Sequence, residues 1–154
     1  RTRFWIEHDA KETFSRQWMN RKLWINDPDC LCLRNFENQI ATEEDFNFHL
    51  CAVLVSDGVL MLGDSLKELE PKDFNRIDKI IEVQKWDKSI TYDDDFTHFV
   101  IKDNKSSRKI DVFFNWINQP ISVKANGNDL FTDLPLDEKE ITIAPFSAKA
   151  VLSE

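Results

Sequence analysis

The first half of the chain alternates between helical and strand-like patterns of apolar residues. Apolar side chains spaced three or four residues apart predict amphipathic helices over three segments. Their inward-facing residues are Ala10, Phe14 and Trp18 between Asp9 and Arg21; Phe46, Leu50, Val53 and Leu54 after Thr42; and Phe74, Ile77, Ile80 and Ile81 after Pro71. Thr42 suits an N-cap, Pro71 suits a first helical turn, and Gly58 suits a C-terminal stop.

Two segments between these helices have the pattern of buried parallel strands. Residues 23–33 begin and end with apolar runs, and residues 59–62 are apolar throughout. A wholly apolar strand is typical of parallel sheets that are covered on both faces, and an intervening helix provides a right-handed crossover. We therefore expect residues 23–33 and 59–62 to form adjacent, parallel strands.

After residue 83 the pattern changes to short extended runs. These are residues 96–101, 109–116, 121–125, 140–144 and 148–152. Asn126-Gly127 predicts a tight turn. We expect residues 84–154 to form an antiparallel β-sandwich domain, preceded by an α/β region at residues 1–83.

The α/β region is too small to be complete. Two parallel strands and three helices cannot close a barrel or cover both faces of a sheet, so their apolar faces need further neighbours. The sequence starts at Arg1, without an initiator methionine or the apolar core of a secretory signal. We expect the chain to be the C-terminal part of a longer enzyme.

Composition and charge exclude several kinds of partner. The 154-residue chain is 42% hydrophobic with a net charge of −8, so it is globular, and its acidic surface would repel nucleic acid. No apolar run approaches the roughly 20 residues that span a bilayer, so no membrane partner is expected. Cys30, Cys32 and Cys51 cannot all pair within one chain, which slightly favours a cytoplasmic location. Their spacing predicts no metal site, and we expect no cofactor.

An acidic turn, Asn26-Asp27-Pro28-Asp29, interrupts the first predicted strand. Acids and a proline are unfavourable in a buried strand, and an element whose pattern fails in its middle is typical of a functional site. Asp27 and Asp29 would lie where a parallel strand ends, and carboxylates there can bind sugar hydroxyl groups. The alternative is an Asp-Pro-Asp turn whose side chains cap backbone amides.

The same segment resembles a motif of a glycosidase family. Trp-x-Asn-Asp-Pro-Asp-Cys-Leu at residues 24–31, with Arg34 behind it, resembles a late barrel strand of the melibiase-type α-galactosidases, glycoside hydrolase family 36, which is related to family 27. Residues 56–64 resemble the final barrel strand of the family, and Phe114-Asn115-Trp116 resembles a short sequence motif of the family's C-terminal β domain. The resemblance implies the last two β/α units of a TIM (β/α)8 barrel followed by an antiparallel β-sandwich.

The resemblance also implies a function. The parent protein would be a retaining glycoside hydrolase that cleaves terminal α-galactosides. Asp29 and Cys30 would line the galactose subsite and Asp27 would be structural, whereas the nucleophile and the acid/base are expected upstream of Arg1. The isolated chain would then be inactive. Asp64 would lie at the rim of the pocket or cap the turn at Ser65 and Leu66.

The expected partners are a galactose-containing oligosaccharide or glycoconjugate, and either a second copy of the chain or the N-terminal part of the same enzyme. Two alternatives stay open: a non-catalytic β-sandwich module that binds carbohydrate or packs against another domain, and a galactosyl-transferring enzyme of the same fold. Trp86, Tyr92 and Trp116 are candidates for a sugar-stacking platform, although Trp116 is better explained as core. The acidic run at residues 93–95 fits a solvated turn better than a calcium loop.

Overall fold

The structure of the protein, a computed structural model, describes residues 3–35, 41–136 and 140–154. The helices within these residues are α1 (Arg3–Ser15), the short 3-10 helix η1 (Gln17–Met19), α2 (Glu43–Ser56) and α3 (Pro71–Gln84). The strands are β1 (Lys88–Tyr92), β2 (His98–Asp103), β3 (Lys109–Phe114), β4 (Ile121–Lys124), β5 (Gly127–Asp129), β6 (Pro135–Leu136), β7 (Glu140–Ile143) and β8 (Ala148–Ser153). None of the described helices is long and apolar enough to cross a bilayer.

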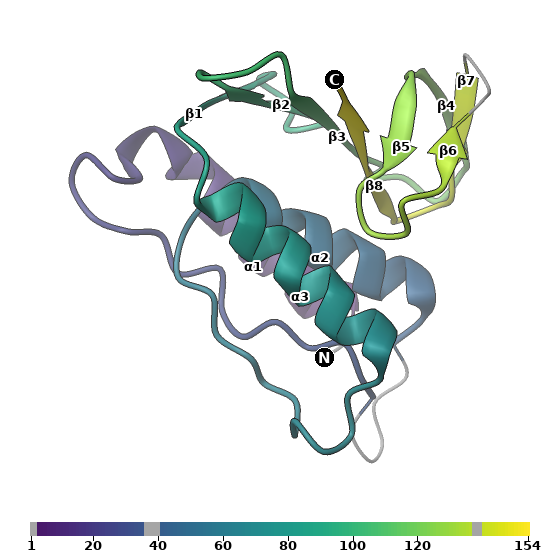
Figure 1. Cartoon of the computed structure of the whole chain (residues 1–154). Helices are drawn as coiled ribbons and strands as arrows, with labels where there is room; N and C mark the ends of the chain where they lie inside the picture. Colours follow the sequence, from purple (N-terminus) through teal and green to yellow (C-terminus); the bar gives the residue numbers. More distant parts are fainter. Residues whose placement is uncertain (1–2, 36–40, 137–139) are drawn as a thin grey trace.

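The helices form a middle layer of the molecule. Figure 1 shows the strands on one side of the helices and the long connections that follow α1 and α2 on the other side. Every residue of α2 from Phe48 to Ser56 is buried, which is typical of a helix covered on all sides. The sequence predicted only one inward face for this helix, because the covering sheet follows much later in the chain.

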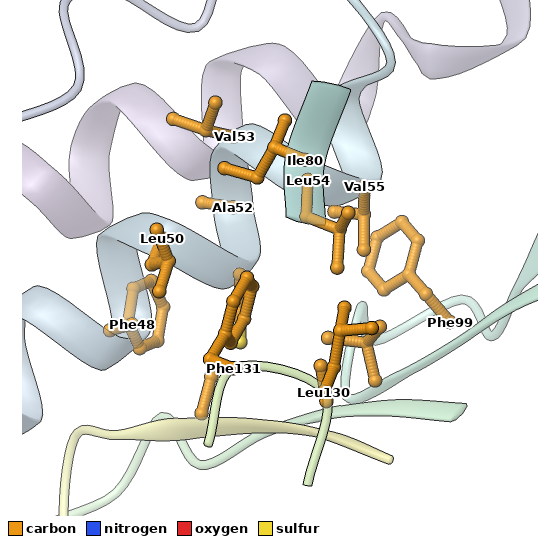
Figure 2. Close-up of a cluster of buried hydrophobic side chains, with 14 of the residues drawn as sticks. Phe48, Leu50, Ala52, Val53, Leu54, Val55, Ile80, Phe99, Leu130 and Phe131 are labelled. Carbon is orange, nitrogen blue, oxygen red and sulfur yellow. The ribbon is translucent and has the colours of Figure 1, made fainter. Parts of the chain in front are cut away.

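A single hydrophobic cluster joins the helices to the sheet. Figure 2 shows side chains of α2 meeting Ile80 of α3, Phe99 of β2, and Leu130 and Phe131 after β5. Phe14 of α1 belongs to the same cluster and is 1% exposed. The secondary structure changes between α3 and β1, but the core continues across this point. The proposed division into residues 1–83 and 84–154 therefore stays a prediction.

The β region is antiparallel, as predicted. Six strands form one sheet in the order β1-β2-β3-β8-β5-β6, and β4 pairs with β7 in a second, two-stranded sheet. Phe99 pairs with Val112 and Ile101 with Ile110 across β2 and β3, and all four side chains are fully buried. The alternation of buried and less buried residues along these strands is the period-2 pattern from which they were predicted. The predicted runs overlap β2, β3, β4, β7 and β8, whereas the sequence pattern missed β1, β5 and β6.

The predicted tight turn at Asn126-Gly127 is wrong. β4 pairs with β7 rather than with β5, so this segment carries the chain from one sheet to the other. Gly127 has φ of +144°, and a Cβ atom there would lie 2.1 Å from the carbonyl oxygen of Leu152. The glycine is required by its close approach to β8, which a sequence pattern for hairpins does not reveal.

The predicted starts of two helices are confirmed. The Thr42 hydroxyl accepts a hydrogen bond from the Asp45 backbone N–H, and the Asp45 carboxylate accepts one from the Thr42 N–H, so a capping box begins α2. Pro71 is the first residue of α3.

Three details of the helix predictions are wrong. α1 ends at Ser15, so Trp18 leaves the apolar stripe and is 58% exposed. Phe74 is 43% exposed although Ile77 and Ile80 are buried. Asp57, with φ of 47°, takes the left-handed position after α2, which had been expected of Gly58. Gly58 is instead needed for close packing, because a Cβ atom there would lie 2.1 Å from the Asn26 carbonyl oxygen.

Candidate functional site

The two predicted strands of the α/β region are extended segments that touch in parallel. Leu31 and Leu62 form an isolated parallel bridge, in which the Leu31 N–H donates to the Met61 carbonyl oxygen at 2.8 Å and the Gly63 N–H donates to the Leu31 carbonyl oxygen at 2.9 Å. The direction and adjacency were predicted correctly. Neither segment forms the regular strand that was predicted, because among the described residues neither has a further strand on its outer side.

The acidic turn is a bulge between two contacts of this pair. Upstream of the bridge, the Val59 N–H donates to the Asn26 carbonyl oxygen at 2.8 Å. Residues 27–30 on the first segment therefore oppose residues 59–61 on the second, which leaves one extra residue on the first. The two acids were expected at the end of a strand, and that expectation is wrong. A bulge re-aims side chains, and bulges are common next to active sites.

The carboxylates of the turn stabilise its backbone. Asp27 accepts a hydrogen bond from the Asp29 N–H at 2.9 Å, and Asp29 accepts one from the Cys30 N–H at 2.5 Å. Asp27 and Asp29 are both exposed, and Cys30 is half-buried. The structure thus contains the amide-capping turn that was the alternative interpretation, with the Asp29 side chain still accessible to solvent.

Asp29 has strained backbone geometry. Its φ of 67° lies in the left-handed region, which L-residues other than glycine occupy at a cost of about 1–3 kcal/mol. Such strain concentrates at functional sites, where surrounding contacts hold it in place.

A buried amide network holds the turn. The Asn26 side chain, whose residue is 4% exposed, donates to Gln17 Oε1 at 2.9 Å and accepts from Trp24 Nε1 at 3.0 Å. Gln17 Nε2 in turn donates to the Val55 carbonyl oxygen at 3.0 Å, and Asn20 Nδ2 donates to the Ser56 carbonyl oxygen at 2.8 Å. The turn is therefore anchored to the C-terminal end of α2. This role of Gln17 and Asn20 was not predicted from the sequence, in which Asn26 within an apolar run was the one signal for it.

Asp64 lies at the opposite end of the bridged pair from Asp29. It accepts a hydrogen bond from the Leu33 N–H at 2.6 Å, so its carboxylate fastens the two segments together, whereas the sequence suggested a cap of the turn at Ser65 and Leu66. Burial raises the pKa of Asp64, although hydrogen bonds from the Leu33 and Arg34 N–H groups oppose this. Asp29 precedes Leu31 by two residues and Asp64 follows Leu62 by two residues, so this parallel register does not bring the two acids together.

Arg34, the last residue of the motif, binds the start of α3. Its guanidinium group pairs with Asp73, and with Glu70 at 3.2 Å. These contacts, of which the hydrogen bond to Glu70 is the strongest cause, raise the pKa of Arg34. Arg34 thus connects the first extended segment to α3.

A shallow cavity of about 340 Å³ lies beside the turn. Its lining includes Trp24 and Asp27, together with Thr13 and Arg16 from the end of the α1 region. Asp29 and Cys30, the residues expected to line a sugar subsite, are not part of this lining. This cavity is therefore not the expected sugar subsite at Asp29 and Cys30.

Large apolar side chains are exposed along the two extended segments. They are Leu23 (68% exposed), Trp24 (46%), Ile25 (58%), Val59 (40%), Met61 (40%) and Leu62 (36%). Exposed apolar side chains that lie together in this way are typical of a surface that contacts another part of a protein or another molecule. The acidic turn lies beside this surface.

The described residues contain no group of three or more His, Cys, Asp or Glu side chains placed to hold a metal ion. Cys30, Cys32 and Cys51 are free thiols, and burial raises the pKa of the Cys51 thiol.

The fold is that of α-galactosidases over nearly the whole chain. A Bacteroides fragilis protein assigned as an α-galactosidase/melibiase matches 97% of the chain with a TM-score of 0.71 and 14% identity. α-Galactosidase I from Mortierella vinacea matches 96% with a TM-score of 0.68 and 12% identity. A Bacillus halodurans protein assigned as an α-N-acetylgalactosaminidase matches 72% with a TM-score of 0.53 and 12% identity.

The chain spans only part of each matched structure. It covers 38% of the Bacteroides fragilis protein, 44% of the Mortierella vinacea enzyme and 30% of the Bacillus halodurans protein. No protein-family model matches this sequence, and no curated protein matches it either. The likeness therefore establishes an α-galactosidase-like fold, and a choice between families 36 and 27 stays a prediction.

Proposed function

We propose that this chain is the C-terminal section of a retaining glycoside hydrolase that cleaves terminal α-galactosides. It would contribute the last two β/α units of a catalytic (β/α)8 barrel, followed by an antiparallel β domain. The observation that carries the proposal is the parallel pair of extended segments, which bears an acidic bulge and an apolar outer surface. Further parallel strands would bury that surface and complete the barrel.

The layering of the molecule supports this assignment. In a (β/α)8 barrel the strands lie inside a ring of helices. The extended segments here lie on one side of the helices and the β region on the other (Figure 1). The segments would then face the barrel interior, and the β region would pack on the outside of the helical ring.

Asp29 is the residue that we propose contacts the substrate, with Cys30 beside it. Asp27 holds the turn through the Asp29 N–H. The exposed carboxylate of Asp29 would accept a hydrogen bond from a galactose hydroxyl group. A retaining enzyme needs two carboxylates roughly 5 Å apart across the scissile bond. Both the nucleophile and the general acid/base would come from a part of the parent protein that this chain does not contain.

The test is the substitution Asp29→Asn in the complete parent enzyme, with kcat/KM measured on aryl α-galactosides of different leaving-group acidity. Loss of a charge-assisted hydrogen bond costs roughly 1.5–3 kcal/mol, so kcat/KM should fall by about tenfold to a hundredfold for every substrate. A general acid would instead show a loss that grows by orders of magnitude as the leaving group becomes poorer. An unchanged kcat/KM would exclude Asp29 from the substrate site.

Asp27→Asn is the matched control. An amide oxygen can still accept from the Asp29 N–H, so the turn should persist and kcat/KM should change less than in Asp29→Asn. We also expect no turnover of an aryl α-galactoside by the isolated 154-residue chain. Robust activity of that chain would show that both catalytic carboxylates lie within it.

A further inference from the structure

A second shallow cavity, open to solvent, lies between α1 and the β region. Its volume is about 630 Å³, which is within the range of small-molecule sites. The lining includes Lys11 and Glu12 of α1, Asp95, Phe96 and Thr97 of the loop between β1 and β2, and Trp116 after β3.

The aromatic part of the cavity is rigidly held. The half-buried Trp116 ring packs edge-on against Phe48, with ring centroids 4.8 Å apart, and against Phe14 at 6.2 Å. Its Nε1–H donates to the Phe96 carbonyl oxygen at 2.9 Å. The two aromatic residues of the lining are therefore fixed relative to one another without any ligand.

The loop that carries Phe96 is also preorganised. The Asp93 carboxylate accepts hydrogen bonds from the Thr97 N–H at 2.7 Å and the His98 N–H at 3.2 Å. Phe96 has φ of 55°, a left-handed conformation that is strained for an aromatic residue and that concentrates at ligand sites. The run of acids at residues 93–95 thus forms a tight turn that places Phe96 and Asp95 at the cavity.

The charges of the lining balance one another. Glu12 pairs with Arg16 at 2.6 Å, which leaves Lys11 and the exposed Asp95 as one cation and one anion. The Lys11 ammonium group lies 5.1 Å from the centroid of the Trp116 ring, so the place where an aromatic ring attracts a cation is already occupied. Neither an anionic nor a cationic ligand is favoured.

We propose that this cavity binds the ring of a neutral pyranoside. The Lys11 ammonium group would move off the Trp116 ring to donate to the hydroxyl groups of the sugar, the apolar face of the sugar would take its place on that ring, and Asp95 would accept hydrogen bonds from the hydroxyl groups. An apolar wall with a few convergent polar groups is the usual composition of a small-molecule site. The site would bind sugar whether or not the parent protein is a galactosidase.

The experiment is saturation-transfer NMR on the full chain, which needs little protein, with methyl α-D-galactopyranoside and methyl α-D-glucopyranoside as probes. We expect saturable, millimolar binding of at least one of the two, and none of the acyclic polyol mannitol. Asp95→Ala should weaken binding about fivefold to tenfold, because it removes a charged hydrogen-bond acceptor. Asp94→Ala is the matched control, since Asp94 is also an exposed acid but does not line the cavity, and this variant should bind like the unsubstituted chain.

Three results would overturn the proposal. They are no saturable binding of either glycoside at tens of millimolar, equal affinity of the Asp94→Ala and Asp95→Ala variants, and stronger binding of tetramethylammonium than of both glycosides. Melting curves of the two variants, recorded on the same samples, establish that each is folded when its binding is measured.

Discussion

The helical region and the β region differ in how completely each covers its own surface. Twelve large hydrophobic side chains are exposed among the described residues, and only Ile117 and Leu134 belong to the β region. The other ten lie between Trp5 and Phe74, mostly on the extended segments. Antiparallel strands that are close in sequence can pair with each other, whereas parallel strands need partners from distant parts of a chain. The strands of the β region therefore find their partners within that region, whereas the parallel extended segments would need partner strands from distant parts of a chain.

The largest effect is expected from Phe14→Ala, which tests whether the two regions are one folding unit. Phe14 lies on α1 but its ring contacts Phe99 and Phe114 of the sheet at centroid distances of 4.7 and 5.2 Å. Removing a fully buried phenylalanine should lower the free energy of unfolding by about 3–5 kcal/mol. Denaturant unfolding, followed by far-UV circular dichroism and tryptophan fluorescence, should show one shared transition that moves to lower denaturant.

Phe74→Ala is the control for that substitution. Phe74 lies on α3 and is 43% exposed, so its truncation should cost much less than that of Phe14. Two separate transitions, with only one of them moved by Phe14→Ala, would show that the regions fold independently.

A smaller effect is expected from Gly58→Ala, which acts on the contact between the extended segments. The new methyl group would meet the Asn26 carbonyl oxygen, and that oxygen already accepts from the Val59 N–H. Overpacking of this kind costs about 1–3 kcal/mol. Hydrogen exchange should speed up at Val59 while the amides of β2 and β3 keep their protection. Unchanged exchange at Val59 would contradict the close approach.

The smallest effect concerns two acids with opposite pKa shifts, Asp103 in the β region and Asp64 in the helical region. The Lys105 N–H, the Ser106 hydroxyl and Arg108 lower the pKa of Asp103 to about 2, below its unfolded value of about 3.9. The stability that Asp103 adds is fully present above the unfolded value and is lost as the pH falls toward about 2. The difference in melting temperature between the unsubstituted chain and Asp103→Asn should therefore shrink over that range.

Asp64 should show the opposite dependence. Burial raises its pKa, so the folded chain binds this proton more tightly than the unfolded chain does. The contribution of Asp64 to stability therefore falls as the pH rises through the raised pKa. Between the unfolded pKa and the raised folded pKa of Asp64, the melting temperature of the unsubstituted chain should fall relative to that of Asp64→Asn. Parallel pH profiles for the Asp64→Asn and Asp103→Asn variants would show that the two acids do not differ in this way.

The sequence predicts best where a structure depends on neighbours nearby in the chain. The capping box at Thr42, the first turn at Pro71 and the alternation along β2 and β3 are local signals, and all are present. The pairing of β4 with β7 and the burial of α2 on all sides depend on distant segments, so local patterns could not reveal them.

The candidate site was predictable in its residues but not in its geometry. The mismatch of acids and a proline within an apolar run located the turn at residues 26–29. Its form as a bulge follows from the contacts of Asn26 with Val59 and of Leu31 with Leu62, which are visible only when both segments are placed. The parallel direction was predictable because a helix separates the two segments.

The extra residue of the bulge sets which way each side chain faces. Side chains alternate along an extended chain, so the four steps from Gly58 to Leu62 return to the same face. The opposing path from Asn26 to Leu31 takes five steps, so a regular extended conformation would turn Leu31 to the opposite face, and the left-handed residue Asp29 in the bulge absorbs the extra step. The acidic turn therefore corrects the parity of the chain as well as carrying the carboxylates. Deleting one residue would give both paths four steps, so the two segments could pair without a bulge and keep their faces, but the turn that carries the carboxylates would be lost.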